Sequence, residues 1–204
     1  MIRMGVDEVG VSDRPFGGFL VVASALGLTA SLALSIEKIE KLQSPDSVLS
    51  CDVSVLVQCS ANLDSWQGAV LGFPNPYLGL IGFALVLGVG VGVFAASRFA
   101  RWFWITFHAG VTAAVLFVAW LISQSIYVLG TLCPWCMVVW AVTIPLFVFV
   151  TGRNLRRGVY GTAVKQIGDA VWPWLPLATV ALCALVVVLA QLRLDVIGSL
   201  LMGL

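Results

Sequence analysis

The chain has 204 residues, of which 60% are hydrophobic and only 10% are charged, and its formal net charge at pH 7 is +1. A soluble domain carries roughly 25% charged residues, so this composition indicates a protein dissolved in a membrane. Nothing in the charge balance suggests a nucleic-acid partner, since such partners select strongly basic surfaces. The five cysteines are too few for a secreted disulfide scaffold of this length.

Five apolar stretches are each long enough to cross a bilayer, which takes about 20 helical residues. The first extends from residue 15 to about 36, after a polar segment, 1–14, that we expect in the cytoplasm. A cleaved signal peptide is the alternative, but its apolar core would be about 7–15 residues, and we favour a retained helix. The helix should continue into water, because Glu37 and Lys41 form an i,i+4 pair, and should end before Pro45. The remaining spans are expected at about 76–97, 102–125, 132–151 and 172–192.

The distribution of basic residues predicts the orientation of these spans. With the N-terminus inside, eight basic residues lie in cytoplasmic segments and three in outer ones, which satisfies the positive-inside rule. The cytoplasmic residues are Arg3, Arg14, Arg98, Arg101, Arg153, Arg156, Arg157 and Lys165, and the outer ones are Lys38, Lys41 and Arg193. This orientation places Cys51, Cys59, Cys133 and Cys136 at the outer face of the plasma membrane. The charges and the cysteines are independent features, so their agreement supports the topology.

Two further patterns concern packing rather than chemistry. Gly88 and Gly92 have the small-xxx-small spacing that lets membrane helices approach closely. Four tryptophans near the cytoplasmic helix ends fit an aromatic belt at one membrane interface: Trp102, Trp104, Trp172 and Trp174. We therefore expect the glycines between helices and the indoles among the lipid headgroups.

The stretch with the clearest chemistry is Cys133-Pro134-Trp135-Cys136, a Cys-x-x-Cys at the start of the fourth span. Two cysteines on one helical turn fall within disulfide reach, since bridged Cα atoms are roughly 4.4–6.8 Å apart. Cys133 can be the boundary residue of the helix and Pro134 its first residue, because the missing N–H of proline costs nothing there. The positive end of the helix dipole would stabilise a thiolate, the reactive form of cysteine. The motif predicts a redox dithiol at the edge of the bilayer.

A second pair, Cys51 and Cys59, lies in the outer loop between the first two spans. On a straight helix their Cα atoms would be roughly 12 Å apart, too far for a disulfide, so the loop must bend if they pair. The two pairs can be structural staples or an electron relay, and we favour the relay, because a staple seldom needs Cys-x-x-Cys on one turn. A four-cysteine zinc site is a weaker alternative, because the 51/59 spacing exceeds the usual two to four intervening residues. We expect no metal, and we expect Cys183 to be a small buried hydrophobe in the fifth span.

Electrons that leave a dithiol at the bilayer edge need an acceptor. The sequence carries no haem or flavin motif, and its single histidine, His108, falls near the cytoplasmic end of the third span, on the wrong side for these thiols. We expect His108 to be packed or interfacial rather than a ligand. A lipid-soluble quinone is the remaining acceptor, and it can reach Cys136, one turn deeper than Cys133, from within the helices.

Several groups of residues occur in a specific order along the chain. They are Cys51-Asp52-Val53-Ser54-Val55-Leu56-Val57-Gln58-Cys59-Ser60, then Ser65-Trp66, Asn75 with Leu78-Gly79, and Cys133-Pro134-Trp135-Cys136. Any one motif alone would be weak, but a spaced cysteine pair followed by a Cys-x-x-Cys that opens the fourth span is specific. The pattern resembles the bacterial homologues of vitamin K epoxide reductase, the VKOR family, over about residues 15–151.

The resemblance implies an all-α membrane protein with five transmembrane helices, in which a four-helix catalytic core, 15–151, surrounds a quinone and a fifth helix is peripheral. The core would include an outer loop, 37–74, and a cytoplasmic loop, 152–171, would lead to the fifth helix and a short outer tail, 172–204. The implied activity is thiol oxidation coupled to reduction of a quinone of the menaquinone, ubiquinone or vitamin K type, in support of disulfide bond formation.

The resemblance also implies roles for the four cysteines. Cys51 would exchange with an external thioredoxin-like protein, and Cys59 would pass electrons to Cys133. Cys136 would face the quinone and form an adduct or a charge-transfer complex with it.

Three further residues match cofactor positions of the family. Asn75 matches the residue that hydrogen-bonds a quinone carbonyl, with a turn residue before Pro76 as the alternative. Ser65 resembles the loop Ser/Thr of the family, although its spacing from Cys59 is one residue shorter than in the animal enzyme. Trp140 stands where the animal enzyme has a tyrosine, four residues after the second cysteine of the motif. The hydroxyl contact of that tyrosine is lost, which argues against epoxide reduction and against the same quinone pose.

Many bacterial members of the family carry a thioredoxin-like domain beyond the fifth helix, whereas this sequence ends at Leu204. We therefore expect a separate electron donor, an exported DsbA-like thioredoxin-fold protein. A DsbB-type oxidase on another scaffold is an alternative, but that family has its Cys-x-x-Cys in the first outer loop and its spaced pair in the second. A non-enzymatic membrane scaffold with structural disulfides is another. A transporter should have buried charges within its spans, and none lies between the helix ends here.

Overall fold

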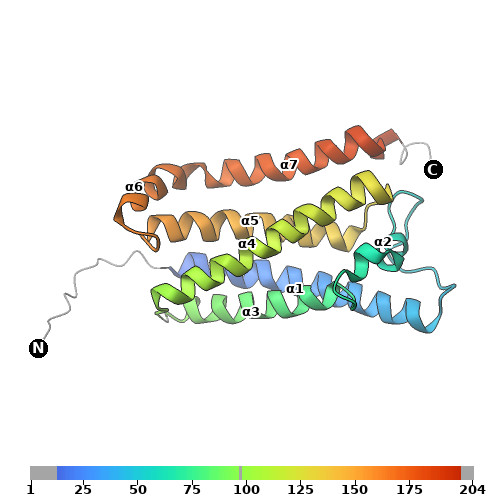
Figure 1. Ribbon diagram of the computed structural model, residues 1–204, viewed down its shortest axis with the longest axis horizontal. Coiled ribbons are helices and arrows are strands. Elements are labelled where there is room, and N and C mark those ends of the chain that lie inside the picture. The colour runs from blue at the N-terminus through green and yellow to red at the C-terminus, as the bar shows by residue number, and fades with distance from the viewer. Residues whose placement is uncertain (1–12, 97, 199–204) are drawn as a thin grey trace, which may run out of the picture.

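The computed structural model describes residues 13–96 and 98–198, and helices make up nearly all of this range (Figure 1). Five helical stretches are long and apolar enough to cross a membrane. They are built on α1 (Arg14–Gln43), α3 (Pro76–Phe94), α4 (Arg101–Ser123), α5 (Pro134–Arg156) and α7 (Leu175–Leu194). The predicted all-α architecture with five transmembrane helices is confirmed.

Local sequence explains where these helices begin and end. A proline stands in the first turn of α1, α3, α5 and α7. Proline suits this position, because its fixed φ is helical and its missing N–H would lack a partner there. The first helix continues past its apolar stretch to Gln43 and ends just before Ser44 and Pro45, as predicted.

Shorter helices connect the spans. They are α2 (Ser60–Asp64), the 3₁₀-helix η1 (Trp66–Ala69), the π-helix η2 (Gln124–Leu129), α6 (Thr162–Val171) and the 3₁₀-helix η3 (Trp172–Trp174). Residues 152–171, which we expected as a loop, are therefore largely helical. The difference arises because α5 runs on past its apolar stretch and because α6, at 10 residues, is too short to be detected as a span.

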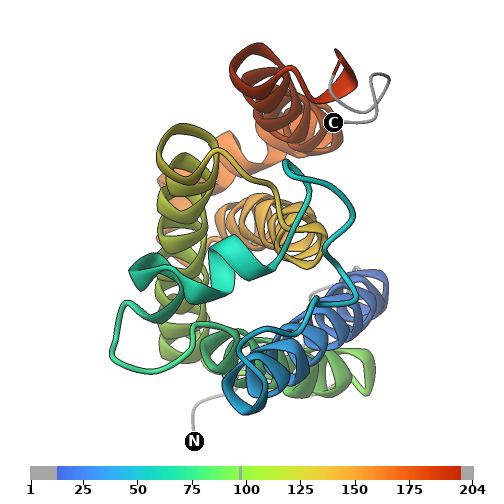
Figure 2. The ribbon, with the colours of Figure 1, turned by 90° about the vertical axis from the view of Figure 1, so that its right-hand side faces the viewer.

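The fifth long helix lies outside a bundle of the other four. Helix α5 packs against α1, α4 and α7, whereas α3 packs chiefly on α1. Viewed along the bundle, α1, α3, α4 and α5 are grouped and α7 lies against α5 on the outer side (Figure 2). Most apolar side chains of α7 are exposed, as expected for a helix that faces lipid. The structure thus has the predicted four-helix bundle with a peripheral fifth helix.

Helices α1 and α3 approach each other closely at a glycine. A Cβ atom at Gly90 would lie 2.9 Å from the Cβ atom of Leu20 and 2.9 Å from the backbone nitrogen of Val21. Gly88, which we expected to share a helix contact with Gly92, has no neighbouring atom within 4 Å of its Cβ position. The prediction was wrong for Gly88: the contact falls two residues further along, on another face of the helix.

The two ends of the bundle differ in chemistry. The cysteine end, on the right in Figure 1, is where the segments that carry Cys51, Cys59, Cys133 and Cys136 meet. The basic end, on the left, holds Arg14, Arg101, Arg153, Arg156, Arg157 and Lys165.

Arg153 joins three segments at the basic end, where only 8% of its surface is exposed. Its guanidinium lies 3.5 Å from the ring centre of Trp104 and donates to the carboxylate of Asp13 at 2.8 Å. A cation–π contact and a charge-assisted hydrogen bond together make a buried guanidinium tolerable. Trp104 is therefore buried, so the aromatic-belt prediction is wrong for it, whereas Trp102 and Trp174 are exposed as expected.

Candidate active site

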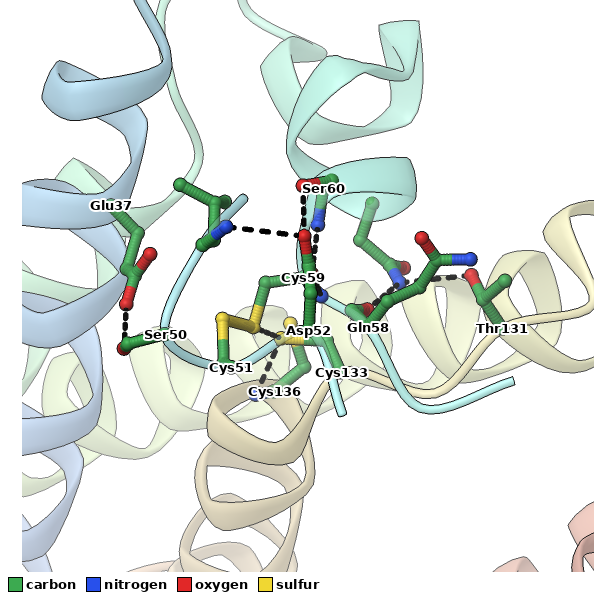
Figure 3. The surroundings of a disulfide bond; sticks show 12 residues. Glu37, Ser50, Cys51, Asp52, Gln58, Cys59, Ser60, Thr131, Cys133 and Cys136 are labelled. Carbon is green, nitrogen blue, oxygen red and sulfur yellow. Dashed lines mark hydrogen bonds between the residues drawn. A yellow bond between two sulfur atoms is a disulfide. The ribbon is translucent and has the colours of Figure 1, made fainter. Parts of the chain in front are cut away.

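The segment between α1 and α3 covers the cysteine end, and Cys51 and Cys59 form a disulfide within it (Figure 3). Their Cα atoms are 5.7 Å apart. The chain reverses between them, where the N–H groups of Val53 and Ser54 donate to the carbonyl oxygen of Val57 at 2.9 and 3.0 Å. The bend that pairing of these cysteines required is confirmed.

This segment also pairs with the chain that leads into α5. The N–H of Gln58 donates to the carbonyl oxygen of Leu132 at 3.0 Å, and the N–H of Leu132 donates to that of Leu56 at 2.7 Å. The bonds form a short parallel bridge. The bridge joins Val57 and Leu132, two residues before Cys59 and one before Cys133, and so brings these two cysteines together.

Asp52 holds the second cysteine of the loop in place. One carboxylate oxygen accepts from the N–H of Cys59 at 2.7 Å and from the N–H of Ser60 at 3.1 Å (Figure 3). The other accepts from the hydroxyl of Ser60 and, at 3.4 Å, from the N–H of Leu49. Burial raises the pKa of Asp52, but these hydrogen bonds outweigh it and hold the pKa below its ordinary value of 3.8. Asp52 therefore carries a negative charge beside the cysteines at neutral pH.

The two cysteine pairs are in contact. The Sγ atoms of Cys59 and Cys133 are 3.2 Å apart, and both side chains are fully buried. Cys133 is the boundary residue of α5, as predicted, and its sulfur accepts from the N–H of Cys136 at 3.4 Å. Thiol–disulfide exchange needs a thiolate in contact with a disulfide sulfur, so Cys59 and Cys133 can exchange without a movement of the loop.

The surroundings of Cys133 favour its thiolate. The Cys136 thiol hydrogen-bonds the Cys133 sulfur and lowers its pKa, and the N–H groups of Cys136 and Trp135 lower it further. Burial and the negative charge of Asp52 raise it, but the net pKa is below the ordinary value of 9.0. The hydrogen bonds at the start of the helix, together with that from the Cys136 thiol, therefore favour the thiolate of Cys133.

A cavity of about 940 Å³ lies inside the bundle, and Cys136 is part of its wall. Its polar side chains include Asn62, Ser65, Gln67, Asn75, Gln124 and Ser125, which come from the cysteine end. Apolar side chains of α3 and α4 line the rest, as far as Trp102 near the basic end. The cavity thus combines a thiol, a small polar region and a long apolar extension.

The three residues predicted to contact a cofactor, Asn75, Ser65 and Trp140, all line this cavity together with Cys136. The Asn75 amide nitrogen donates to the carbonyl oxygen of Gln67 at 2.6 Å, and its oxygen accepts from the N–H of Val70 at 3.2 Å. Asn75 therefore also organises the turn before α3.

The other two differ in how they are held. The Ser65 hydroxyl donates to the carbonyl oxygen of Asn62 at 2.8 Å. Trp140 is buried, and over the part of the chain that the structure describes its indole N–H has no hydrogen-bond partner. Both groups lie in the cavity wall, where a ligand could reach them.

Some residues of the site had no role in the sequence-based prediction. Asn62 links three segments: its amide donates to the Thr131 hydroxyl at 3.1 Å and its oxygen accepts from the Ser125 hydroxyl at 2.9 Å. Glu37, which we expected only in a water-exposed pair with Lys41, is instead buried and accepts from the Ser50 hydroxyl, so that prediction was wrong. Its second carboxylate oxygen has no partner among the described residues (Figure 3). Among the residues that hold the cysteines in place, only Asp52 could be suspected from the local sequence, because it lies between Cys51 and Cys59. The partners of Asn62 and Glu37 lie too far away in the sequence to be inferred from it.

The remaining cysteine and the histidine lie apart from the site. Cys183 is half-buried on α7 and is a free thiol. His108 bonds the hydroxyls of Thr151, at 2.8 Å, and Tyr160, so it is packed between helices as predicted. Within the described ranges, no group of three or more His, Cys, Asp or Glu residues could hold a metal ion.

Five transmembrane helices, with two touching cysteine pairs at one end and a cavity beside one of them, define a multi-pass membrane protein with a candidate thiol site. The model of the Vitamin K epoxide reductase family matches residues 19–151, more than half of the chain. The protein therefore belongs to this family, which is a family of membrane oxidoreductases. No curated individual protein is similar enough to refine the assignment.

Proposed function

We propose that the protein is a membrane thiol oxidase that takes electrons from an exported DsbA-like thioredoxin-fold protein and reduces a quinone, in support of disulfide bond formation. The observation that carries this proposal is the 3.2 Å contact between Cys59 and Cys133, next to a cavity that Cys136 lines. A scaffold needs no contact between separate cysteine pairs, whereas a relay depends on one.

In the first stage, the partner reduces the loop disulfide. A partner thiolate bonds to the sulfur of Cys51, and the Cys51–Cys59 bond breaks to release Cys59 as a thiolate. The second partner thiolate then attacks the mixed disulfide, so that the partner leaves as a disulfide and Cys51 is released. Two electrons now reside on the loop thiols.

In the second stage, the Cys59 thiolate attacks the Cys133 sulfur of an oxidised Cys133–Cys136 pair and releases Cys136 as a thiolate. Attack of Cys51 on Cys59 restores the loop disulfide and frees Cys133. A quinone bound beside Cys136 would take up the two electrons as Cys133 forms the disulfide bond with Cys136, which returns the pair to its oxidised form. The lowered pKa of Cys133 supports this closing step, because it increases the share of the attacking sulfur that is thiolate.

The cavity suits a quinone. A bound quinone would supply an acceptor for two electrons and two protons. Asn75, Ser65 and Trp140 would hold its ring at the polar end beside Cys136, and the apolar walls of α3 and α4 would hold an isoprenoid tail. Ligand cavities of membrane and soluble proteins alike are mostly apolar with a few placed polar groups.

The proposed orientation puts the cysteine end outside and the basic end in the cytoplasm, because Arg and Lys residues collect at cytoplasmic helix ends. It also places the disulfide in an oxidising compartment, where such bonds persist. Labelling of Cys133 from only the cytoplasmic side of intact cells would overturn this orientation and the relay together.

Replacement of Cys136 by alanine tests the mechanism. Purified Cys136→Ala with quinone and a reduced thioredoxin-fold partner should lose at least about 10³-fold in quinone reduction, because the thiol that delivers electrons is gone. Cys183→Ala is the control, because that thiol lies on α7 and outside the relay. Retained quinone reduction in Cys136→Ala would reject the proposal.

A further inference from the structure

Four amide side chains lie at the polar end of the cavity, and they differ in which of their donors and acceptors already have a hydrogen-bond partner in the protein. They are Asn62, Gln67, Asn75 and Gln124. The amide nitrogen of Asn62 donates to Thr131 and to Gln58, and that of Asn75 donates to a backbone carbonyl. These two side chains hold loops together.

Gln67 and Gln124 form a pair across two segments. The Nε2 atom of Gln67 donates to the Oε1 atom of Gln124 at 3.3 Å, and Gln67 is buried with 4% of its surface exposed. The pair fixes the direction of the Gln124 amide, whose Nε2 atom has no hydrogen-bond partner among the described residues. Gln124 is half-buried, so this unpaired donor is open to the cavity and a ligand there could accept from it.

Gln124 lines the cavity where the polypeptide leaves α4. It is the first residue of the π-helix that follows α4, a local distortion that is frequent at functional sites. Cys136, in the first turn of α5, lines the same cavity. The two side chains therefore border one space from two different segments of the bundle.

We infer that Gln124 donates a hydrogen bond through Nε2 to a carbonyl oxygen of the quinone, and that Gln67 is the residue that positions it. The inference rests on the proposed function and adds a second amide donor to Asn75. Such a donor stabilises the charge that gathers on the oxygen as electrons arrive from Cys136. It also restricts the substrate to rings with a carbonyl oxygen in reach of both amides.

Two substitutions at Gln124 separate a donor from a structural role. Gln124→Met has a similar shape but no hydrogen bond, and Gln124→Glu keeps an oxygen that accepts from Gln67 but removes the donor. Both should raise the KM for quinone about tenfold, the effect of losing one good hydrogen bond. Gln166→Met, at an exposed position on α6, is the matched control.

The carbonyl stretching band of bound, isotope-labelled quinone provides a readout that does not depend on turnover. Loss of a hydrogen bond moves this band to higher wavenumber in both Gln124 variants, but not in Gln166→Met. Gln67→Met should have a smaller effect, and the double variant Gln67→Met with Gln124→Met should be no worse than Gln124→Met, because a positioning residue acts only through its partner.

The possible outcomes separate a failure of the Gln124 role from a failure of the proposed function. If wild-type protein reduces quinone while both Gln124 variants keep its KM and its carbonyl band, the role of Gln124 is overturned and the proposed function stands. If Gln124→Met is impaired but Gln124→Glu keeps the wild-type KM and band, the pair is structural and the donor role is again overturned. If wild-type protein neither binds nor reduces quinone, the proposed function and this inference both fail.

Discussion

The reactivity of the cysteine end depends on the protonation of one sulfur, that of Cys133. Two neighbours act on it in opposite directions: the Cys136 thiol lowers the pKa of Cys133 by hydrogen bonding, and the Asp52 carboxylate raises it by charge repulsion. Because the thiolate is the form that attacks a disulfide, the balance between these neighbours would set how readily Cys133 exchanges with Cys59 in the proposed relay.

We expect Asp52→Asn to lower the pKa of Cys133 and Cys136→Ala to raise it. Asparagine keeps an oxygen that can accept from the N–H of Cys59, so the loop stays capped while the repulsive charge is lost. The rate of Cys133 alkylation by iodoacetamide, followed by mass spectrometry, should therefore rise at lower pH in the first variant and at higher pH in the second. Shifts in the same direction would contradict the opposing roles.

The role of a single residue could be predicted from the sequence where its neighbours in the sequence determine it. The role could not be predicted where the determining partner is distant in the sequence. Cys133 was recognisable as a helix boundary from the proline that follows it. Gln124 has its partner, Gln67, 57 positions earlier in the chain. Trp104 stands at the end of an apolar run like a belt residue, and only the fold reveals that Arg153 from another helix covers it.

Between helices, the close contact of α1 with α3 depends on which face of α3 carries the small residues. Gly90→Ala should lower thermal stability by about 1–3 kcal/mol, because its Cβ atom would lie 2.9 Å from Leu20 and from the backbone of Val21. Gly88→Ala, on the same helix but with no atom within 4 Å, should be neutral or stabilising. Thermal unfolding in detergent measures both, and equal melting temperatures would refute the assigned face.

The spans could be predicted because length and hydropathy are properties of the sequence itself. The packing face could not: the spacing of Gly88 and Gly92 defines a stripe on the helix, but not whether that stripe meets α1 or lipid. The short α6 was missed because one side of it is polar and it is only 10 residues long, which leaves no apolar run to detect.

Over the whole molecule, the cysteine end carries the proposed redox chemistry, and contacts at the basic end hold the helices together. Asp13→Ala should destabilise the protein by about 3–5 kcal/mol, because it leaves the buried guanidinium of Arg153 without its carboxylate. Asp169→Ala removes a carboxylate from an exposed pair with Arg156 at the same end and should cost at most about 1 kcal/mol. Thermal melts provide the comparison, and equal losses would show that Arg153 does not depend on Asp13.

The cavity is long enough to bury the isoprenoid tail of a quinone as well as its ring. The wall runs from Cys136 to Trp102, near the opposite end of the bundle, so a long isoprenoid chain would be buried along most of it. Each buried CH₂ group stabilises binding by about 0.8 kcal/mol. The KM should therefore fall as isoprenoid units are added to the same ring.

Gly110 allows this extension to be blocked without disturbing the ring. It lines the cavity on α4, and a Cβ atom there would meet no atom within 4 Å, so Gly110→Phe should fold and place its ring in the space of the tail. We expect the KM for a long-tailed quinone to rise at least about tenfold, since a few CH₂ groups lose their burial. The KM for a tail-free ring should not change, because Asn75 and Cys136 stay in place. Gly88→Phe, outside the cavity wall, controls for bulk on a glycine site. An unchanged KM for the long-tailed quinone would mean that the tail leaves the bundle before it reaches Gly110 and that the long cavity serves another purpose. An equal rise for both quinones would mean that Gly110→Phe disturbs the ring site, which would contradict the separation of ring and tail.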